Sequence, residues 1–225
     1  VLRLKFGPTD YFTQMVTDLN VNHPVRESYA KAASITEHPV SEFASILAIN
    51  LNLVTKDGYL ILTEQSPQSF VASGRLHTSV GENLLRPLDA QQSGAPDPFQ
   101  CAVRGAWEEL GVTLRYEDIV FHTFTVIPDF CQYSLISTIR IQQTRAEIEE
   151  IWSLGVPSDK WEHRRLLFSL HNPDALAQLT VSTWNQWFNV ALTAIISSLL
   201  DVGYTQTQIN EAFSRAQSTS SLQRK

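Results

Sequence analysis

Cysteine is scarce in this chain of 225 residues, which contains two cysteines, Cys101 and Cys131. Two cysteines are too few for a disulfide scaffold, which needs several pairs. Both stand among apolar residues, where a free cysteine behaves as a small hydrophobic side chain. We therefore expect two buried thiols in a reducing compartment, and we predict that the protein is cytoplasmic.

Positive charge is also in deficit, because 17 lysines and arginines stand against 23 aspartates and glutamates and give a formal net charge of −6. A surface that binds nucleic acid needs a basic excess, so the composition predicts no nucleic-acid partner. An anionic small ligand is not excluded, because a few arginines and a divalent cation are enough to neutralise phosphates.

Long apolar runs are missing, since none reaches the ~18 residues that a membrane span requires. The longest, residues 190–200, is interrupted by Thr193, Ser197 and Ser198. We expect no membrane partner and see no signal peptide. The chain begins at Val1 and not at a methionine, so we keep open that it is a processed product or part of a larger parent chain.

What is present is a globular composition, which divides along the chain into four segments. Residues 1–42 predict an N-terminal extension with a strand and a helix. Residues 43–172 predict a domain of strands with inserted helices, and residues 173–216 predict helices packed on its core. Residues 217–225 are polar and serine-rich, and we expect them to be disordered. The order predicts the α+β class: an α/β/α sandwich with a mixed β-sheet and helical N- and C-terminal extensions.

The local patterns place the elements. A hairpin is expected over 46–54 and 59–62, and further strands over 70–80, 119–127, 133–141 and 166–170. Helices are expected over 99–110 and 146–152, and then over 175–179, 183–200 and 206–216. Gly111 closes the helix over 99–110, and Thr205 caps the last helix. The apolar face of 183–200 is interpreted as core or as a homodimer surface.

The helix expected over 99–110 carries the chemistry. Residues three and four apart are neighbours on a helix, so positions 105, 108 and 109 share one face. Glu108 and Glu109 would repel each other if they only faced water. Beside a pocket they form a hard-oxygen site for Mg²⁺ or Mn²⁺, which holds pyrophosphate oxygens and activates water.

This run resembles the helix of the Nudix box, whose pattern is Arg-Glu-apolar-any-Glu-Glu-any-Gly-apolar. Arg104, Glu108, Glu109 and Gly111 match in register, and Gly81 resembles the glycine that opens the box. The resemblance covers roughly residues 43–170. It implies a divergent Nudix-type fold, Mg²⁺ or Mn²⁺ as cofactor and a nucleoside diphosphate derivative as ligand. Arg104 is expected to pair with a carboxylate and set the helix.

Two departures bear on catalysis. Gly105 stands where the family has the first glutamate of the helix, and a glycine within a helix costs about 1 kcal/mol relative to alanine. In addition, 22 residues separate Gly81 from Arg104 (104 − 81 − 1), more than in the family pattern, which indicates an insertion between Asn83 and Asp97. Asp97 is a shorter substitute for the glutamate that the family carries in this loop. At least one carboxylate of the usual set is therefore missing.

The resemblance also implies roles outside the helix. Trp107 either packs under the inserted loop or stacks on a base. Arg75 and Arg86 flank the expected pocket and are candidates for holding phosphates. A third acidic metal ligand is expected from a later loop, with Glu162 as the first candidate. The alternatives are Glu147, Glu149 and Glu150.

Three functional hypotheses follow from these residues. The leading one is a hydrolase that cleaves the pyrophosphate of a nucleotide sugar, an ADP-ribose-like compound or a dinucleotide with Mg²⁺-activated water. In this hypothesis Gly105→Glu is expected to raise hydrolysis and leave the fold intact. The second is a catalytically impaired Nudix domain that senses or binds a nucleotide within a larger protein, and the third is an interaction scaffold.

Overall fold

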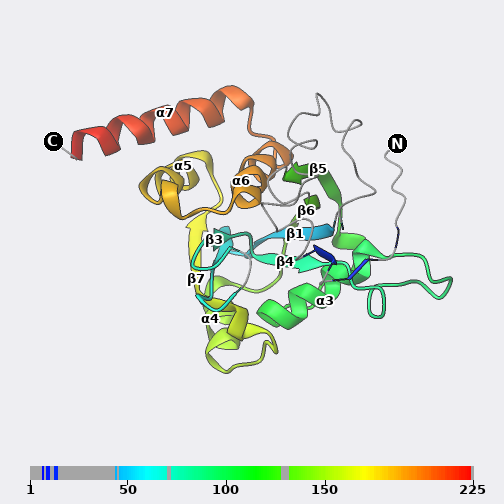
Figure 1. Ribbon diagram of the computed structural model, residues 1–225. Helices are drawn as coiled ribbons and strands as arrows, with labels where there is room; N and C mark the ends of the chain where they lie inside the picture. Colours follow the sequence, from blue (N-terminus) through cyan, green and yellow to red (C-terminus); the bar gives the residue numbers. More distant parts are fainter. Residues whose placement is uncertain are drawn as a thin grey trace, which may run out of the picture.

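The computed structural model describes residues 7, 9–10, 13–14, 44, 46–69, 72–127 and 132–223, with side chains as far as residue 220. These residues form one mixed β-sheet with helices on both faces (Figure 1). The predicted α+β sandwich is confirmed. The predicted N-terminal strand, most of the N-terminal helix and Cys131 lie outside the described residues.

The sheet is built around two central parallel strands, β1 (Leu47–Val54) and β6 (Gln132–Arg140), paired in register from Leu47–Tyr133 to Val54–Arg140. Its path runs β3-β2-β1-β6-β5, with β4 also pairing with β1 and β7 with β2. The remaining strands are β2 (Tyr59–Gln65), β3 (Leu76–His77), β4 (Val80–Asn83), β5 (Phe121–Ile127) and β7 (His163–Leu170). The predicted hairpin is confirmed as β1 and β2, with Val54 opposite Leu60.

Alternation along the central strands supplies two cores, one on each face of the sheet. In β2, Ile61 joins the cluster under α3 (Pro98–Leu110) and α4 (Arg145–Ser153), whereas Leu60 and Leu62 join the cluster on the opposite face. Successive side chains of a strand point to opposite faces, which explains this division. In β1, the amide of Asn52 donates to the Ala194 carbonyl at 2.9 Å, on the face opposite α3.

Helices α5 (Pro173–Ser182) and α6 (Asn189–Asp201) cover that opposite face, and α7 (Gln206–Gln223) packs on their outer side (Figure 1). Leu200 at the end of α6 is exposed, but the apolar residues that face the sheet are buried, so the interpretation of this face as core is confirmed. They include Val190, Ala191, Ala194, Ile195 and Leu199. Thr205 caps α7 by accepting from the Gln208 N–H at 3.3 Å, as predicted. None of the helices in the described ranges combines the length and apolar character of a membrane span.

Three predicted elements differ in the structure. The strand expected over 70–80 is divided into β3 and β4, because the Ser79 hydroxyl accepts from Leu53 N–H and donates to the Ile61 carbonyl, bridging two strands. The single helix expected over 183–200 is interrupted, because buried Trp187 pairs with Leu76 of β3. Finally, α7 continues to Gln223, so the prediction of a disordered tail from 217 is wrong over 217–223.

The helix predicted to end at Gly111 does so, and this ending yields a test. Gly111 has a left-handed conformation with φ of 68°, and a Cβ there would lie 2.8 Å from Cγ2 of Ile151 on α4. We expect Gly111→Ala to lower the free energy of unfolding by about 2–4 kcal/mol, through backbone strain and overpacking together. Urea denaturation measures the loss. Gly58→Ala is the control, because Gly58 also has positive φ (89°) but open space around it. Equal losses in the two variants would contradict the packing contribution.

Candidate functional site

The site is organised around Glu109, a buried carboxylate on the face of α3 that meets the sheet. Glu109 accepts a hydrogen bond from the Gly81 N–H of β4 at 3.1 Å and lies 2.8 Å from Nε2 of His163, the first residue of β7. Its exposed fraction is 2%. One side chain thus ties α3 to two strands that are far apart in the sequence.

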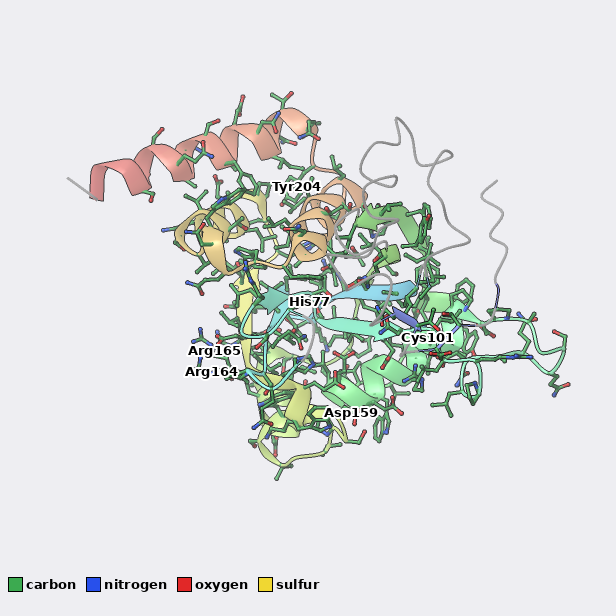
Figure 2. The ribbon with its side chains drawn as sticks, in the orientation of Figure 1. His77, Cys101, Asp159, Arg164, Arg165 and Tyr204 are labelled. Atoms are coloured by element: carbon green, nitrogen blue, oxygen red, sulfur yellow. The ribbon has the colours of Figure 1, made fainter. Side chains whose placement is uncertain are left out.

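Glycine is required at position 81 because the His77 ring lies against it. A Cβ on Gly81 would lie 2.7 Å from Cε1 of His77, a separation that real side chains do not show. His77 is buried, its Nδ1 lies 2.9 Å from Oγ1 of Thr78, and its ring stacks on Phe188 with centroids 5.4 Å apart. Figure 2 labels His77 in the plane of the sheet. Burial, and then the neighbouring His163, lower the pKa of His77 to about 3.

This depressed pKa predicts acid sensitivity. The unfolded chain binds a proton at position 77 near pH 6.5 and the folded chain does not, so stability falls as the pH decreases from 6.5 toward 3. His77 alone is expected to remove about 2 kcal/mol between pH 7 and pH 5. Urea denaturation of the unmodified chain and of His77→Gln at the two pH values gives this loss as the difference between the two proteins. Both share the contribution of His171, whose pKa burial lowers to about 4, and that of Glu82, whose pKa is raised to about 7 and whose contribution has the opposite sign. Identical slopes in both proteins would refute the assignment.

Arg104, one turn before Glu108, forms ion pairs with three carboxylates around α3. Its guanidinium donates to Asp89 in a two-point contact at 2.9 and 2.8 Å, and Nη1 lies 2.7 Å from Glu108 and 3.0 Å from Glu82. Burial acts to lower the pKa of Arg104, but the Asp89 hydrogen bond and the charges of Glu82 and Glu108 outweigh it and raise the pKa. Arg104 therefore carries a permanent charge that orders the helix and the inserted loop.

Two further carboxylates lie beside this centre, and only one of them was a sequence-based candidate. Glu162, in a single 3-10 turn (Lys160–Glu162) before β7, has its pKa raised by burial and then by the charge of Glu109. Glu82 on β4 was not predicted. Burial, followed by the charge of Glu109, raises the pKa of Glu82 to about 7, although Arg104 lowers it.

The carboxylates around Glu109 are the side chains that could hold the predicted divalent cation. Carboxylate oxygens are the ligands that Mg²⁺ and Mn²⁺ prefer, and the raised pKa values of Glu82 and Glu162 come from burial and repulsion that a cation would relieve. The oxygen ligands of these residues are therefore of the chemical type that such an ion binds. Across the described ranges, however, no three acidic, histidine or cysteine side chains converge as a ligand group. In this arrangement Arg104 and His163 hold Glu108 and Glu109.

The residues predicted to bind substrate lie at three different positions in the structure. Nη1 of Arg75 donates to the carbonyls of Asn185 and Trp187 at 3.2 and 3.4 Å, and the phosphate-binding role of Arg75 stays a prediction. Arg86 is exposed in the inserted loop. Trp107 is 50% exposed, and both of its predicted roles, packing under that loop and stacking on a base, stay predictions.

The acidic alternatives also have structural roles. Asp97 caps α3 by accepting from two backbone N–H groups, and the loop carboxylate that pairs with Arg104 is Asp89. Glu147 completes the capping box of α4, and Glu149 pairs with Arg145 at 2.9 Å on the exposed side of that helix. Glu150 is exposed on the same helix. Of the sequence candidates for a third ligand, the structure brings only Glu162 near Glu109.

Sequence reasoning missed Glu82, Asp89 and His163. Glu82 could have been predicted from its position, because it directly follows Gly81, which the sequence already indicated as the glycine that opens the box. Asp89 lies in a loop of 13 residues between Asn83 and Asp97 (97 − 83 − 1), and nothing in the local sequence marks it. His163 adjoins Glu162, but its contact with Glu109 spans 54 positions.

Comparisons with known proteins were made by sequence and by structure. No family model and no curated protein matches the sequence. A solved structure of DR0079 from Deinococcus radiodurans is 16% identical, with a TM-score of 0.44 over 66% of this chain and 80% of that one. A MutT protein from Methanosarcina mazei is 10% identical, with a TM-score of 0.42 over 71% of this chain and 96% of that one.

A third structure is a bifunctional NMN adenylyltransferase/ADP-ribose pyrophosphatase from Francisella tularensis, complexed with AMP and a manganese ion. It is 11% identical, with a TM-score of 0.46, and the match covers 69% of this chain and 41% of that one. At such identities and scores the likeness concerns the arrangement of elements and says nothing of activity. The solved structures to which this chain is similar in fold thus include MutT/Nudix proteins, at low sequence identity.

Proposed function

We propose that this chain is a divergent Nudix-type hydrolase that cleaves the pyrophosphate of a nucleoside diphosphate linked to another group. Nucleotide sugars, ADP-ribose-like compounds and dinucleotides are the substrate classes. The observation that supports the proposal is the buried carboxylate of Glu109, which follows Glu108 on α3 and whose charge, after burial, raises the pKa of Glu162. A bound cation would relieve this repulsion between carboxylates.

In this proposal Glu108, Glu109 and Glu162 hold Mg²⁺ or Mn²⁺. The bound ion would neutralise the pyrophosphate and lower the pKa of a water molecule. The chain itself orients the carboxylates. Gly81 N–H and His163 fix Glu109, while Arg104 fixes Glu108. The exposed Trp107, beside Glu108 in the sequence, is available to stack on the base.

A second function, a module that senses or binds a nucleotide without hydrolysing it, is favoured by a specific observation. Position 105 of α3 is glycine, and both glutamates of the helix already have cationic or histidine partners within the protein. Carboxylates that are already paired in this way have weaker means of holding a metal ion and of activating water. The two functions predict the same ligand class and differ in turnover.

The deciding experiment is a screen of the purified chain with Mg²⁺ or Mn²⁺ against nucleotide sugars, ADP-ribose, dinucleotides and nucleoside triphosphates. Each compound is scored for release of a nucleoside monophosphate and for a shift in melting temperature, with EDTA as the metal-free control. Metal-dependent turnover supports the hydrolase and identifies the substrate class. A thermal shift without turnover supports the sensing module, and neither effect with any compound would refute both.

The proposal includes a reducing, cytoplasmic compartment, because Cys101 is a free buried thiol whose pKa is raised by burial. Association as a homodimer stays a prediction. Most of the apolar face that suggested a dimer is buried in the core under α6, whereas Trp184 and Leu200 of the same segment are exposed.

A further inference from the structure

Strand β7 begins with an irregularity that brings two arginines together. Its pairing with β2 shifts register between Glu64 and Gln65, so that Glu64 lies opposite Arg165 and Gln65 lies opposite His163. Arg164 is the extra residue of this β-bulge, between the two paired residues of β7. Successive side chains of a regular strand point to opposite faces, but a bulge redirects a side chain, which allows Arg164 and Arg165 to reach the same group.

The group that both arginines contact is the carboxylate of Glu64. Nη1 of Arg164 donates to its Oε1 at 2.9 Å, and Nε of Arg165 donates to its Oε2 at 2.6 Å. Figure 2 labels the two arginines next to each other at the start of β7, on the outer edge of the molecule. The Glu64 side chain is 7% exposed, whereas those of Arg164 and Arg165 are 65% and 59% exposed. A buried carboxylate thus holds two exposed guanidinium groups in place.

The two guanidinium groups keep most of their hydrogen-bonding capacity. An arginine side chain has five N–H donors, and within the described part of the chain each of these arginines uses one nitrogen, on Glu64. One arginine is enough to neutralise Glu64, so the three side chains together carry a net charge of +1 (2 − 1). Arg75 adds a further positive charge nearby, because it precedes Leu76, which pairs with Glu64 from β3. This edge of the sheet is therefore positive, although the chain as a whole is acidic.

We propose that Arg164 and Arg165 form a binding site for a doubly charged phosphate group, either the free ion or a phosphate monoester on a small ligand. Planar guanidinium forks match the oxygens of phosphate, and two of them match its two charges. The net charge of −6 favours a small anion over a polyanionic partner such as nucleic acid or a lipid surface.

This site is separate from the carboxylates around Glu109. Glu64 is two residues after Leu62, whose side chain packs on the face opposite α3, so Glu64 and Glu109 lie on opposite faces of the sheet. The inference therefore does not rest on the proposed hydrolase, and it adds an anion site that the helix pattern does not contain.

The test titrates the metal-free chain with inorganic phosphate, in EDTA at about pH 8, and follows binding by calorimetry. Phosphate is doubly charged at this pH. We expect saturable binding, which Arg164→Gln combined with Arg165→Gln weakens about 10-fold or more, because charge-assisted contacts from both side chains are lost. Arg115→Gln is the matched control, because Arg115 is 67% exposed and also pairs with two carboxylates, those of Glu117 and Asp118. It should bind phosphate as the unmodified chain does.

Changing Glu64 provides the sharper arm. Glu64→Gln keeps the shape of the side chain and removes the charge that competes with the ligand, so we expect phosphate to bind about 3-fold more tightly or better. If the arginines served only to neutralise Glu64, this change would leave phosphate binding as it was. Adding Glu64→Gln to the double arginine variant removes the phosphate site without leaving a buried carboxylate unpaired. Urea denaturation checks that each variant is folded.

Phosphate binding that is lost in the arginine variants and tightened in Glu64→Gln supports the site. A comparison of inorganic phosphate with glycerol 3-phosphate then shows whether the ligand is the free ion or an ester. Equal binding in all variants would indicate an adventitious ion only and overturn the assignment, as would absence of binding to the unmodified chain. Tighter binding of acetate than of phosphate would overturn the phosphate class. Because the titration contains no metal and no pyrophosphate, its failure leaves the proposed hydrolase standing.

Discussion

Arg104→Met is expected to lower the free energy of unfolding by about 3–5 kcal/mol, the loss typical when one partner of a buried ion pair is removed. Asp89 is fully buried, and both of its carboxylate oxygens accept from the Arg104 guanidinium at 2.9 and 2.8 Å. Methionine fills a similar volume but leaves that charge without its partner. Equilibrium urea denaturation at pH 7 measures the loss.

Two comparisons make this first prediction specific. Arg145→Met removes an exposed pair with Glu149, whose side chains are 44% and 48% exposed, together with cation–π contacts to Tyr59 and Phe168, and is expected to cost about 1 kcal/mol. Arg104→Met combined with Asp89→Asn should recover part of the loss, because the uncompensated charge is removed. A loss in Arg104→Met no larger than that in Arg145→Met would contradict the role of Arg104 as the organising charge.

Changing both Glu108 and Glu109 to glutamine is expected to abolish Mg²⁺-dependent binding and turnover of pyrophosphates while leaving stability almost unchanged. Loss of about 3 kcal/mol of metal and transition-state binding corresponds to on the order of 100-fold in turnover. The fold should persist, because a glutamine at position 109 still accepts from Gly81 N–H and its amide donates to an unprotonated Nε2 of His163.

Binding titrations with and without Mg²⁺, beside urea denaturation, check this second prediction. The single variants divide the effect between Glu109, which is 2% exposed, and Glu108, whose side chain is 27% exposed and shared with Arg104. Glu117→Gln serves as the surface control, because it changes a carboxylate whose side chain is 66% exposed and which contacts Arg115. Metal-dependent binding that survives the double change would remove α3 from the proposed metal site.

What the sequence determined on its own was local. Helix α3, its left-handed ending at Gly111, the turn between β1 and β2, and the cap of α7 at Thr205 each follow from residues within one or two turns of one another. Short-range hydrogen bonds and a side-chain period of 2 or 3.6 residues decide such elements, so a sequence pattern is enough to predict them. The register of Arg104, Glu108 and Glu109 on one helix belongs to this class.

The tertiary structure alone decided which side chains meet. Asp89 reaches Arg104 across 15 positions, and His163 reaches Glu109 across 54, through chain segments whose patterns carry no sign of the contact. Likewise, Ser79 divides a predicted strand and Trp187 interrupts a predicted helix, because each bonds to a distant strand. Packing between elements fixes these contacts, and it also brings the Glu82 side chain of β4 close to the glycine at position 105 of α3.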